Sequence, residues 1–279
     1  MLIRFWGARG SIPVSGKENL RYGGDTTCVE IRTADGEIVV IDAGSGIRRL
    51  GKLLMREGRL SITLIFTHAH WDHVMGFPFF LPIYQKGAVV RMMGCPFAQK
   101  AVKDIIAMTM RPPVFPVKFN DIAAKFSAIR ICDKPFRIGG MKVEPVPLSH
   151  PNRGLGYRFT ERGGSFVFLT DNELGLVHPG GLAMEDYVKF CRGATLLVHD
   201  SEFLDSEYPR RRAWGHSTLS QALDLALASS VERLGLFHHN QDRTDRQVDA
   251  MARECRARIR REGSKLGCFA VSEGLEVRL

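Results

Sequence analysis

The feature that most constrains this chain is a histidine-rich segment at residues 67–73, with the sequence THAHWDH. It directly follows an apolar run, residues 62–66, that is typical of a buried strand. Loops at strand ends often carry functional side chains, and imidazole nitrogens with carboxylate oxygens are ligands for zinc and similar divalent metals. In an extended segment the first two histidines can face one ion. The aspartate and the third histidine can reach a second ion once the chain turns.

Further candidate ligands lie downstream. A site for two metals needs more ligands than this one segment supplies. His150, Asp171 and His239 each follow a short apolar run that we predict to be a strand. A single histidine or aspartate at a strand end is more often structural, but three in equivalent positions favour a common site. We therefore expect them to converge on the histidine-rich segment.

Short apolar runs alternate with amphipathic stretches along the chain, which predicts an α/β fold with layered sheets and helices. The expected strands are 2–6, 27–33, 37–42, 62–67, 88–93, 141–147, 155–160, 165–170, 195–199, 233–237 and 275–279. The expected helices are 47–56, 97–110, 181–190, 219–227 and 248–259, with a capping box of Thr218 and Gln221 before the fourth. The proline-rich stretch 111–121 is expected to be a loop.

Composition sets broad limits. The 279 residues are 44% hydrophobic and 25% charged, which excludes a disordered or low-complexity chain. No apolar run is long enough to span a membrane, and the first residues lack the pattern of a secretory signal, so we expect a cytoplasmic protein without membrane association. The net charge of +9 permits an anionic substrate or nucleic acid but does not require either.

The six cysteines are widely spaced and include no C-x-x-C pair. Neither a disulfide framework nor a thiolate metal cluster is expected from such spacing. We predict that all six are small, buried hydrophobic residues.

The histidine-rich segment and its downstream partners resemble the metallo-β-lactamase superfamily. Asp42, in the run 41–46 (IDAGSG), resembles the family's Asp-x-Gly turn, whose aspartate supports the metal loop without binding metal. The resemblance covers the chain and implies one hydrolase domain over residues 1–279, folded as a four-layer αββα sandwich. It implies two divalent metal ions per chain, commonly zinc and sometimes manganese or iron. The implied ligands are His68, His70 and His150 for the first ion, Asp72, His73 and His239 for the second, and Asp171 between them.

A second motif narrows the branch. Residues 214–218 (WGHST) resemble the His-Ser-Thr motif of ribonuclease Z-like phosphodiesterases, whose histidine acts as a proton donor. This implies that role for His216. The family's orienting carboxylate comes from a His-Glu-Ala segment; here residues 198–202 read VHDSE, so Asp200 takes that place. The alternative is that His216 only packs beneath the helix that follows.

Two departures from relatives limit the chemistry. His70 stands where oxygen-reducing diiron relatives carry glutamate, which disfavours redox chemistry. Between Asp171 and His199 nothing resembles the long arm with which ribonuclease Z holds transfer RNA. The start of the chain, residues 5–11 (FWGARGS), is more similar to a related group of small hydrolases.

The resulting hypothesis is a phosphodiesterase acting on a small or cyclic phosphodiester, perhaps a nucleotide. A hydroxide bridging the metals would attack, Asp72 would orient it, and His216 would protonate the leaving group. Trp71 could stack on a ring of the substrate or simply pack against the wall. The alternatives are a nuclease, a carboxyl-ester, thioester or lactone hydrolase, and a metal-binding module without turnover; a homodimer is possible. Candidate substrate contacts are Arg9, Arg210, Arg211 and Arg212.

Overall fold

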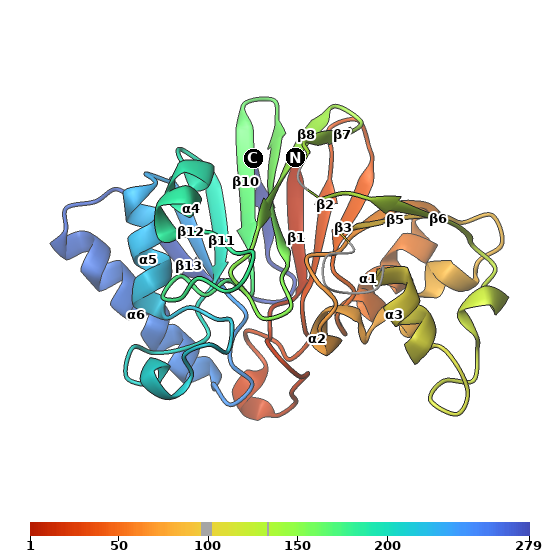
Figure 1. Ribbon diagram of the computed structural model, residues 1–279, viewed down its shortest axis with the longest axis horizontal. Coiled ribbons are helices and arrows are strands. Elements are labelled where there is room, and N and C mark those ends of the chain that lie inside the picture. Colours follow the sequence, from red (N-terminus) through yellow and green to blue (C-terminus); the bar gives the residue numbers. More distant parts are fainter. Residues whose placement is uncertain (96–101, 133) are drawn as a thin grey trace.

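The strands of the chain form two seven-stranded mixed sheets, seen in a computed structural model that describes residues 1–95, 102–132 and 134–279 (Figure 1). The first sheet has the order β14-β1-β2-β3-β4-β5-β6 and the second β13-β12-β11-β10-β9-β8-β7. The strands of the first sheet are β1 Leu2–Gly7, β2 Cys28–Arg32, β3 Ile38–Ile41, β4 Ser61–Ile65, β5 Val89–Gly94, β6 Lys125–Arg130 and β14 Glu276–Arg278. Those of the second are β7 Phe136–Ile138, β8 Met141–Pro147, β9 Leu155–Glu161, β10 Gly164–Leu169, β11 Leu196–Asp200, β12 Arg233–Phe237 and β13 Gly267–Ala270.

The sheets pack face to face, and helices cover their outer faces (Figure 1). Fully buried aromatic residues such as Phe5, Phe159 and Phe168 fill the space between the sheets. On the first sheet lie α1 Ile47–Arg56 and α3 Val102–Thr109, and on the second α4 Met184–Cys191, α5 Leu219–Ala228 and α6 Asp245–Arg261. These four layers confirm the predicted αββα sandwich. In the described part of the chain, no helix is both long and apolar enough to cross a membrane.

Strand direction explains how distant segments meet at one edge. In the first sheet β3, β4, β5 and β6 are parallel, and β1 runs the same way because two antiparallel pairings separate it from β3. In the second sheet β10 to β13 are parallel, and β8 shares their direction for the same reason. The loops that leave the carboxyl ends of these strands therefore gather at one edge of each sheet.

Most predicted elements are present in the structure. The strands that the sequence analysis did not predict are short or exposed. The strands β6, β7 and β13 were not predicted. Lys125–Arg130 is largely exposed at the edge of its sheet, so it carries no apolar alternation, and Phe136–Ile138 has only three residues. The capping box of Thr218 and Gln221 is confirmed. Of the helix expected at 97–110, residues 97–101 lie outside the described part.

The prediction that all six cysteines are unpaired is wrong. Cys95 and Cys132 form a disulfide that joins the segments following β5 and β6. These two residues are 37 positions apart in the sequence, and only the parallel pairing of the two strands brings them together. The other four cysteines are buried and free, as predicted.

Arg9, predicted as a substrate contact, is instead buried, with 1% of its surface exposed. Its guanidinium donates to the carbonyls of Gly23, Asn240 and Arg243 and to Oδ1 of Asn19, at 2.7–3.2 Å. Burial lowers the pKa of Arg9 from its ordinary value, while the nearby carboxylates act in the opposite direction. Arg9 thus joins three loops from inside the protein and is not available to a ligand.

We expect Arg9→Met to lower the free energy of unfolding by about 3 kcal/mol, because several buried carbonyls would lose their donor. Urea denaturation measures this. The exposed Arg212 offers a matched control, and Arg212→Met is expected to change stability by less than about 0.5 kcal/mol. Unchanged stability of the Arg9 variant would show that the hydrogen bonds of Arg9 to these loops do not stabilise the fold.

Candidate metal centre

Loops from both sheets bring two groups of histidine and aspartate side chains together. The loop after β4 supplies His68 and His70, and the short helix α2 Trp71–Val74 supplies Asp72 and His73. The segments after β8, β10 and β12 supply the rest. The first group is His68, His70, His150 and Asp171, and the second is Asp72, His73, Asp171 and His238. Within each group the nearest nitrogen and oxygen atoms all lie within 4.8 Å, and Asp171 belongs to both.

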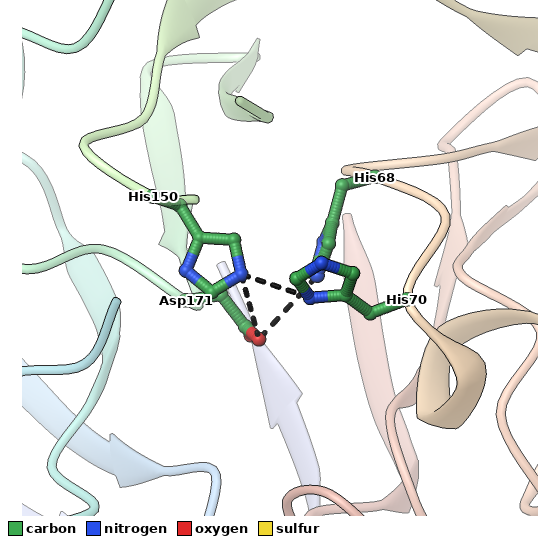
Figure 2. A group of neighbouring side chains, drawn as sticks. All are labelled: His68, His70, His150 and Asp171. Atoms are coloured by element: carbon green, nitrogen blue, oxygen red, sulfur yellow. Dashed lines mark hydrogen bonds and ion pairs between the residues drawn. The ribbon is translucent and has the colours of Figure 1, made fainter. Parts of the chain in front are cut away.

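In the first group, four side chains point at a common centre (Figure 2). His150 Nε2 lies 3.0 Å from His70 Nδ1. Asp171 Oδ2 lies 3.5 Å from His68 Nε2 and 3.9 Å from His150 Nε2. Three imidazoles and one carboxylate around one point form a donor set suited to a divalent cation.

The second group contains two carboxylates, one more than the first. His73 Nε2 lies 3.3 Å from Asp72 Oδ2 and 3.3 Å from Asp171 Oδ1. His238 Nε2 lies 3.2 Å from the same oxygen of Asp72 and 3.4 Å from the same oxygen of Asp171. The backbone N–H of Ser11 donates to Asp72 Oδ2 at 2.9 Å, which fixes that carboxylate from the first loop.

The outward nitrogen of several rings is held by a partner behind it. Such partners fix the orientation of a metal-binding histidine and leave its other nitrogen free to bind. The pairs are His73 Nδ1 with Asp42 at 2.8 Å, His150 Nδ1 with the carbonyl of Gly215 at 2.9 Å, and His238 Nδ1 with Glu202 at 2.9 Å. Asp42 also accepts from the N–H and hydroxyl of Thr67, so it supports the metal loop from behind.

Three of the residues at these strand ends have a strained backbone. Asp42, Asp171 and His238 adopt left-handed conformations, with φ of 60°, 59° and 54°. Such a conformation costs a non-glycine residue roughly 1 kcal/mol or more. Asp42 and His238 directly follow the last residue of their strands, and Asp171 lies two residues beyond the end of β10. The turn lets the side chain leave the sheet edge toward the site.

Burial and charge set the protonation of the two groups. Burial lowers the pKa of His68 and His70, and that of His150 to about 3, so these rings are neutral and keep a lone pair for a metal. Burial alone would raise the pKa of Asp171, but the surrounding histidines hold it well below its usual value. In His73 the effect of burial is outweighed by three carboxylates, which raise its pKa. The second group therefore attracts positive charge.

The residues present fit two divalent ions. His68 Nε2 and His73 Nε2 are buried, and neither has a hydrogen-bond partner among the described residues. A buried ring nitrogen without a partner is costly, and both atoms face a group of potential ligands. Each group could hold one metal ion, with Asp171 positioned between them.

One predicted ligand must be corrected, because the structure places His238 and not His239 in the second group. β12 ends at Phe237, and the left-handed turn at His238 directs its ring toward Asp72 and Glu202. His239 continues in an extended bridge beside Arg9, and its Nε2 donates to the carbonyl of Val271 at 2.8 Å. The two adjacent histidines fit the sequence pattern equally well. Only the backbone turn at His238 decides which of them enters the second group.

This pair provides a matched test. We expect His238→Ala to reduce bound metal from about two ions per chain to about one, because the second group loses a ligand. His239→Ala is expected to retain both ions and to lose about 1–3 kcal/mol of stability, because a buried carbonyl loses its donor. Elemental analysis measures the bound metal, and thermal unfolding measures the stability. Loss of an ion in the His239 variant but not in the His238 variant would show that His239 is the ligand.

His216 lies beside both groups. Its ring is 4.7 Å from that of His238 and 5.4 Å from that of His150, measured between centroids. Asp200 Oδ2 lies 3.9 Å from His216 Nδ1, which is beyond hydrogen-bond length. The two Asp200 oxygens accept from the backbone N–H groups of Asn172 and Ser217, at 2.9 and 2.7 Å. Asp200 thus holds the site loops together and faces His216 only at ion-pair distance.

Glu202 was not predicted as a site residue from the sequence. This carboxylate is 4% exposed, and its Oε2 lies 3.5 Å from His216 Nε2 while it accepts a hydrogen bond from His238. Burial alone would raise its pKa, but His216 and His238 lower it, so Glu202 stays ionised. Its position two residues beyond Asp200, after the same strand, was the only available signal.

The remaining predicted contacts, Arg210, Arg211 and Arg212, lie in the loop that leads to His216. Arg210 and Arg212 are exposed. The guanidinium of Arg211 lies over the ring of Trp214, 4.5 Å from its centroid.

The profile of the beta-lactamase superfamily domain matches residues 38–239, which include every residue of the two groups. The chain belongs to this superfamily. Ribonuclease Z of Gemmatimonas aurantiaca is 26% identical over 317 residues, covering 95% of each chain. Among solved structures of similar fold, a diphosphatase of the PhnP family has a TM-score of 0.71 at 20% identity, covering 100% of this chain and 97% of that chain. The short form of human tRNase Z has a TM-score of 0.68 at 19% identity, covering 100% of this chain and 99% of that chain.

This superfamily membership confirms the resemblance seen in the sequence. Ribonuclease Z and the diphosphatase are hydrolytic enzymes, and this chain is a metal-dependent hydrolase. The fold and the two groups imply divalent metal ions.

Proposed function

We propose that this hydrolase cleaves small phosphodiesters, cyclic or linear, with two divalent ions, most readily zinc, in the two groups. The observation that carries the proposal is the place of His216, with its ring beside both His150 and His238. An alkoxide leaving from phosphorus benefits from a proton donor at this position.

Bound in these groups, the ions would supply Lewis acidity and a reactive water for attack on phosphorus. The protein's own residues would do the rest. Asp72, fixed by the Ser11 N–H, would accept a hydrogen bond from the attacking water and orient it. Asp171 would hold the two halves of the site in register, since it lies in both groups.

His216 would give its proton to the leaving oxygen. Its Nδ1 is buried without a hydrogen-bond partner in the described part of the chain, and its Nε2 lies 3.5 Å from Glu202 Oε2. The ring is fixed by stacking on His238 and by the edge of Phe203, at centroid distances of 4.7 and 5.9 Å. Glu202 would act as a positioning residue, because it contacts both histidines.

Cleavage of RNA is the second candidate, because relatives over most of the chain are ribonuclease Z enzymes. The segment between Asp171 and His199 argues against a structured RNA as substrate, because nothing in it resembles the long arm with which ribonuclease Z holds transfer RNA. All of its residues are described, and its only helix or strand besides the start of β11 is the eight-residue helix α4.

The test is to load the purified chain with zinc and measure turnover of bis(p-nitrophenyl) phosphate, 2′,3′-cyclic nucleotides, p-nitrophenyl acetate and a transfer RNA precursor. We expect diester turnover that a chelator abolishes and zinc restores, exceeding ester turnover by at least about tenfold. Preferred hydrolysis of the ester would overturn the proposal in favour of an ester or lactone hydrolase. Cleavage of the RNA alone would support the second candidate.

A further inference from the structure

The two exposed tryptophans of this chain lie close in sequence to residues of the metal centre. Of its three tryptophans, Trp6 is partly buried and donates through Nε1 to Glu30. Trp71 is 53% exposed and lies between His70 and Asp72. Trp214 is 55% exposed and lies two residues before His216. Large aromatic surface left in solvent beside a catalytic centre is typical of substrate binding.

Trp214 offers one open face. The guanidinium of Arg211 stacks on its ring at 4.5 Å from the centroid, within the range of a cation–π contact. An indole with one face covered can remain 55% exposed only if its other face is largely in solvent. Arg211 also lies 6.0 Å from the ring of Phe203, which itself contacts His216. The stacked pair is thus connected to the proposed proton donor.

The loop that carries this pair is held rigidly. The carboxylate of Glu173 is 1% exposed and accepts hydrogen bonds from the hydroxyl of Tyr208 and the N–H groups of Ala213 and Gly215, at 2.6–2.8 Å. Ala213 and Gly215, on either side of Trp214, both have positive φ, at 71° and 92°. A strained turn held by a buried carboxylate fixes the position of an exposed side chain that contributes little to the core.

The same loop touches the metal ligands. The carbonyl of Gly215 accepts from His150 Nδ1, and a Cβ at Gly215 would lie 2.0 Å from that nitrogen. Consecutive Cα atoms are about 3.8 Å apart, so the Cα of Trp214 lies that far from the Cα of Gly215, which contacts a residue of the first group. Trp214 therefore directly precedes the residue whose carbonyl holds His150.

We propose that Trp214, backed by Arg211, stacks on the nucleobase of the substrate, so that the substrate is a nucleoside phosphodiester. The inference rests on the proposed phosphodiesterase function and specifies its substrate. Stacking uses the π-face that every base offers, so little preference among bases is expected.

The test compares adenosine 5′-monophosphate with ribose 5-phosphate, which differ by the base alone, in calorimetric titrations of the zinc-loaded chain. We expect the adenosine nucleotide to bind at least about tenfold more tightly. Trp214→Ala is expected to reduce this preference to less than about twofold, and Trp214→Phe to keep most of it. Phe79 is a matched control, since it is an aromatic residue with 54% exposure that packs on Phe115, and Phe79→Ala should leave the preference unchanged.

Equal binding of the two phosphates, or a preference that survives Trp214→Ala, would overturn the inference. A full zinc content in the alanine variant shows that its centre is intact. Loss of the preference together with diester turnover in the parent chain supports both proposals, whereas a base preference without any diester turnover contradicts only the proposed function. Titration with a ten-nucleotide DNA strand at two salt concentrations tests whether the stacked base belongs to a nucleic-acid strand or to a free nucleotide. Binding of a strand is expected to weaken steeply as the salt concentration rises.

Discussion

Asp171→Asn is expected to deprive the protein of both metal ions at once. Asp171 is the residue common to the two groups, with Oδ2 facing His68 and His150 and Oδ1 facing His73 and His238. The amide keeps the shape of the side chain but removes its negative charge. We expect metal content to fall from about two ions per chain to below one. Diester turnover should fall at least about a thousandfold, more than the 10–100-fold typical of losing an outer partner of a ligand.

Elemental analysis of the dialysed variant and initial rates with a diester measure the two effects. The exposed Asp242 is the matched control, and Asp242→Asn should keep both the metal and the activity. If Asp171→Asn retained two ions and normal turnover, the shared position of this carboxylate would have no functional meaning. The two groups would then be separate clusters of polar residues.

His216→Ala is expected to slow cleavage according to the leaving group. A general acid contributes about 100- to 10,000-fold when the departing oxygen needs a proton. With an alkyl leaving group, as in a 2′,3′-cyclic nucleotide, we expect a loss of that size. With p-nitrophenolate, which leaves readily as an anion, the loss should be less than about tenfold.

The two substrates serve as controls for each other, because the same variant and the same metal content apply to both. Rates are measured across pH with zinc-saturated protein, and elemental analysis verifies two ions per chain. Equal losses for the two leaving groups would show that His216 acts as a structural residue. That result would support the alternative in which it only packs beneath α5.

Much of this site could be predicted from sequence because its ligands are local in the chain or lie at strand ends. The histidine-rich segment carries four side chains of the site within six residues, and the apolar strand before it fixes their place at the sheet edge. His150 and Asp171 follow from the same rule. The αββα layers follow from the alternation of strands and helices and from the family resemblance.

What could not be predicted depends on backbone turns and on contacts between distant loops. The choice between His238 and His239 is made by one left-handed residue, which no hydrophobic pattern reveals. An arginine in a glycine-flanked loop reads as a ligand contact, yet Arg9 is buried because loops from both ends of the chain close over it. The Cys95–Cys132 disulfide likewise needs the pairing of β5 with β6, an edge strand that the sequence did not reveal.

The most direct test of the whole account is metal content per chain, measured together with diester turnover before and after chelation. We expect about two divalent ions per chain, loss of turnover when they are removed, and recovery when zinc is returned. A chain that binds no metal, or that cleaves diesters equally well without it, would show that the two groups around Asp171 do not form a hydrolytic metal centre.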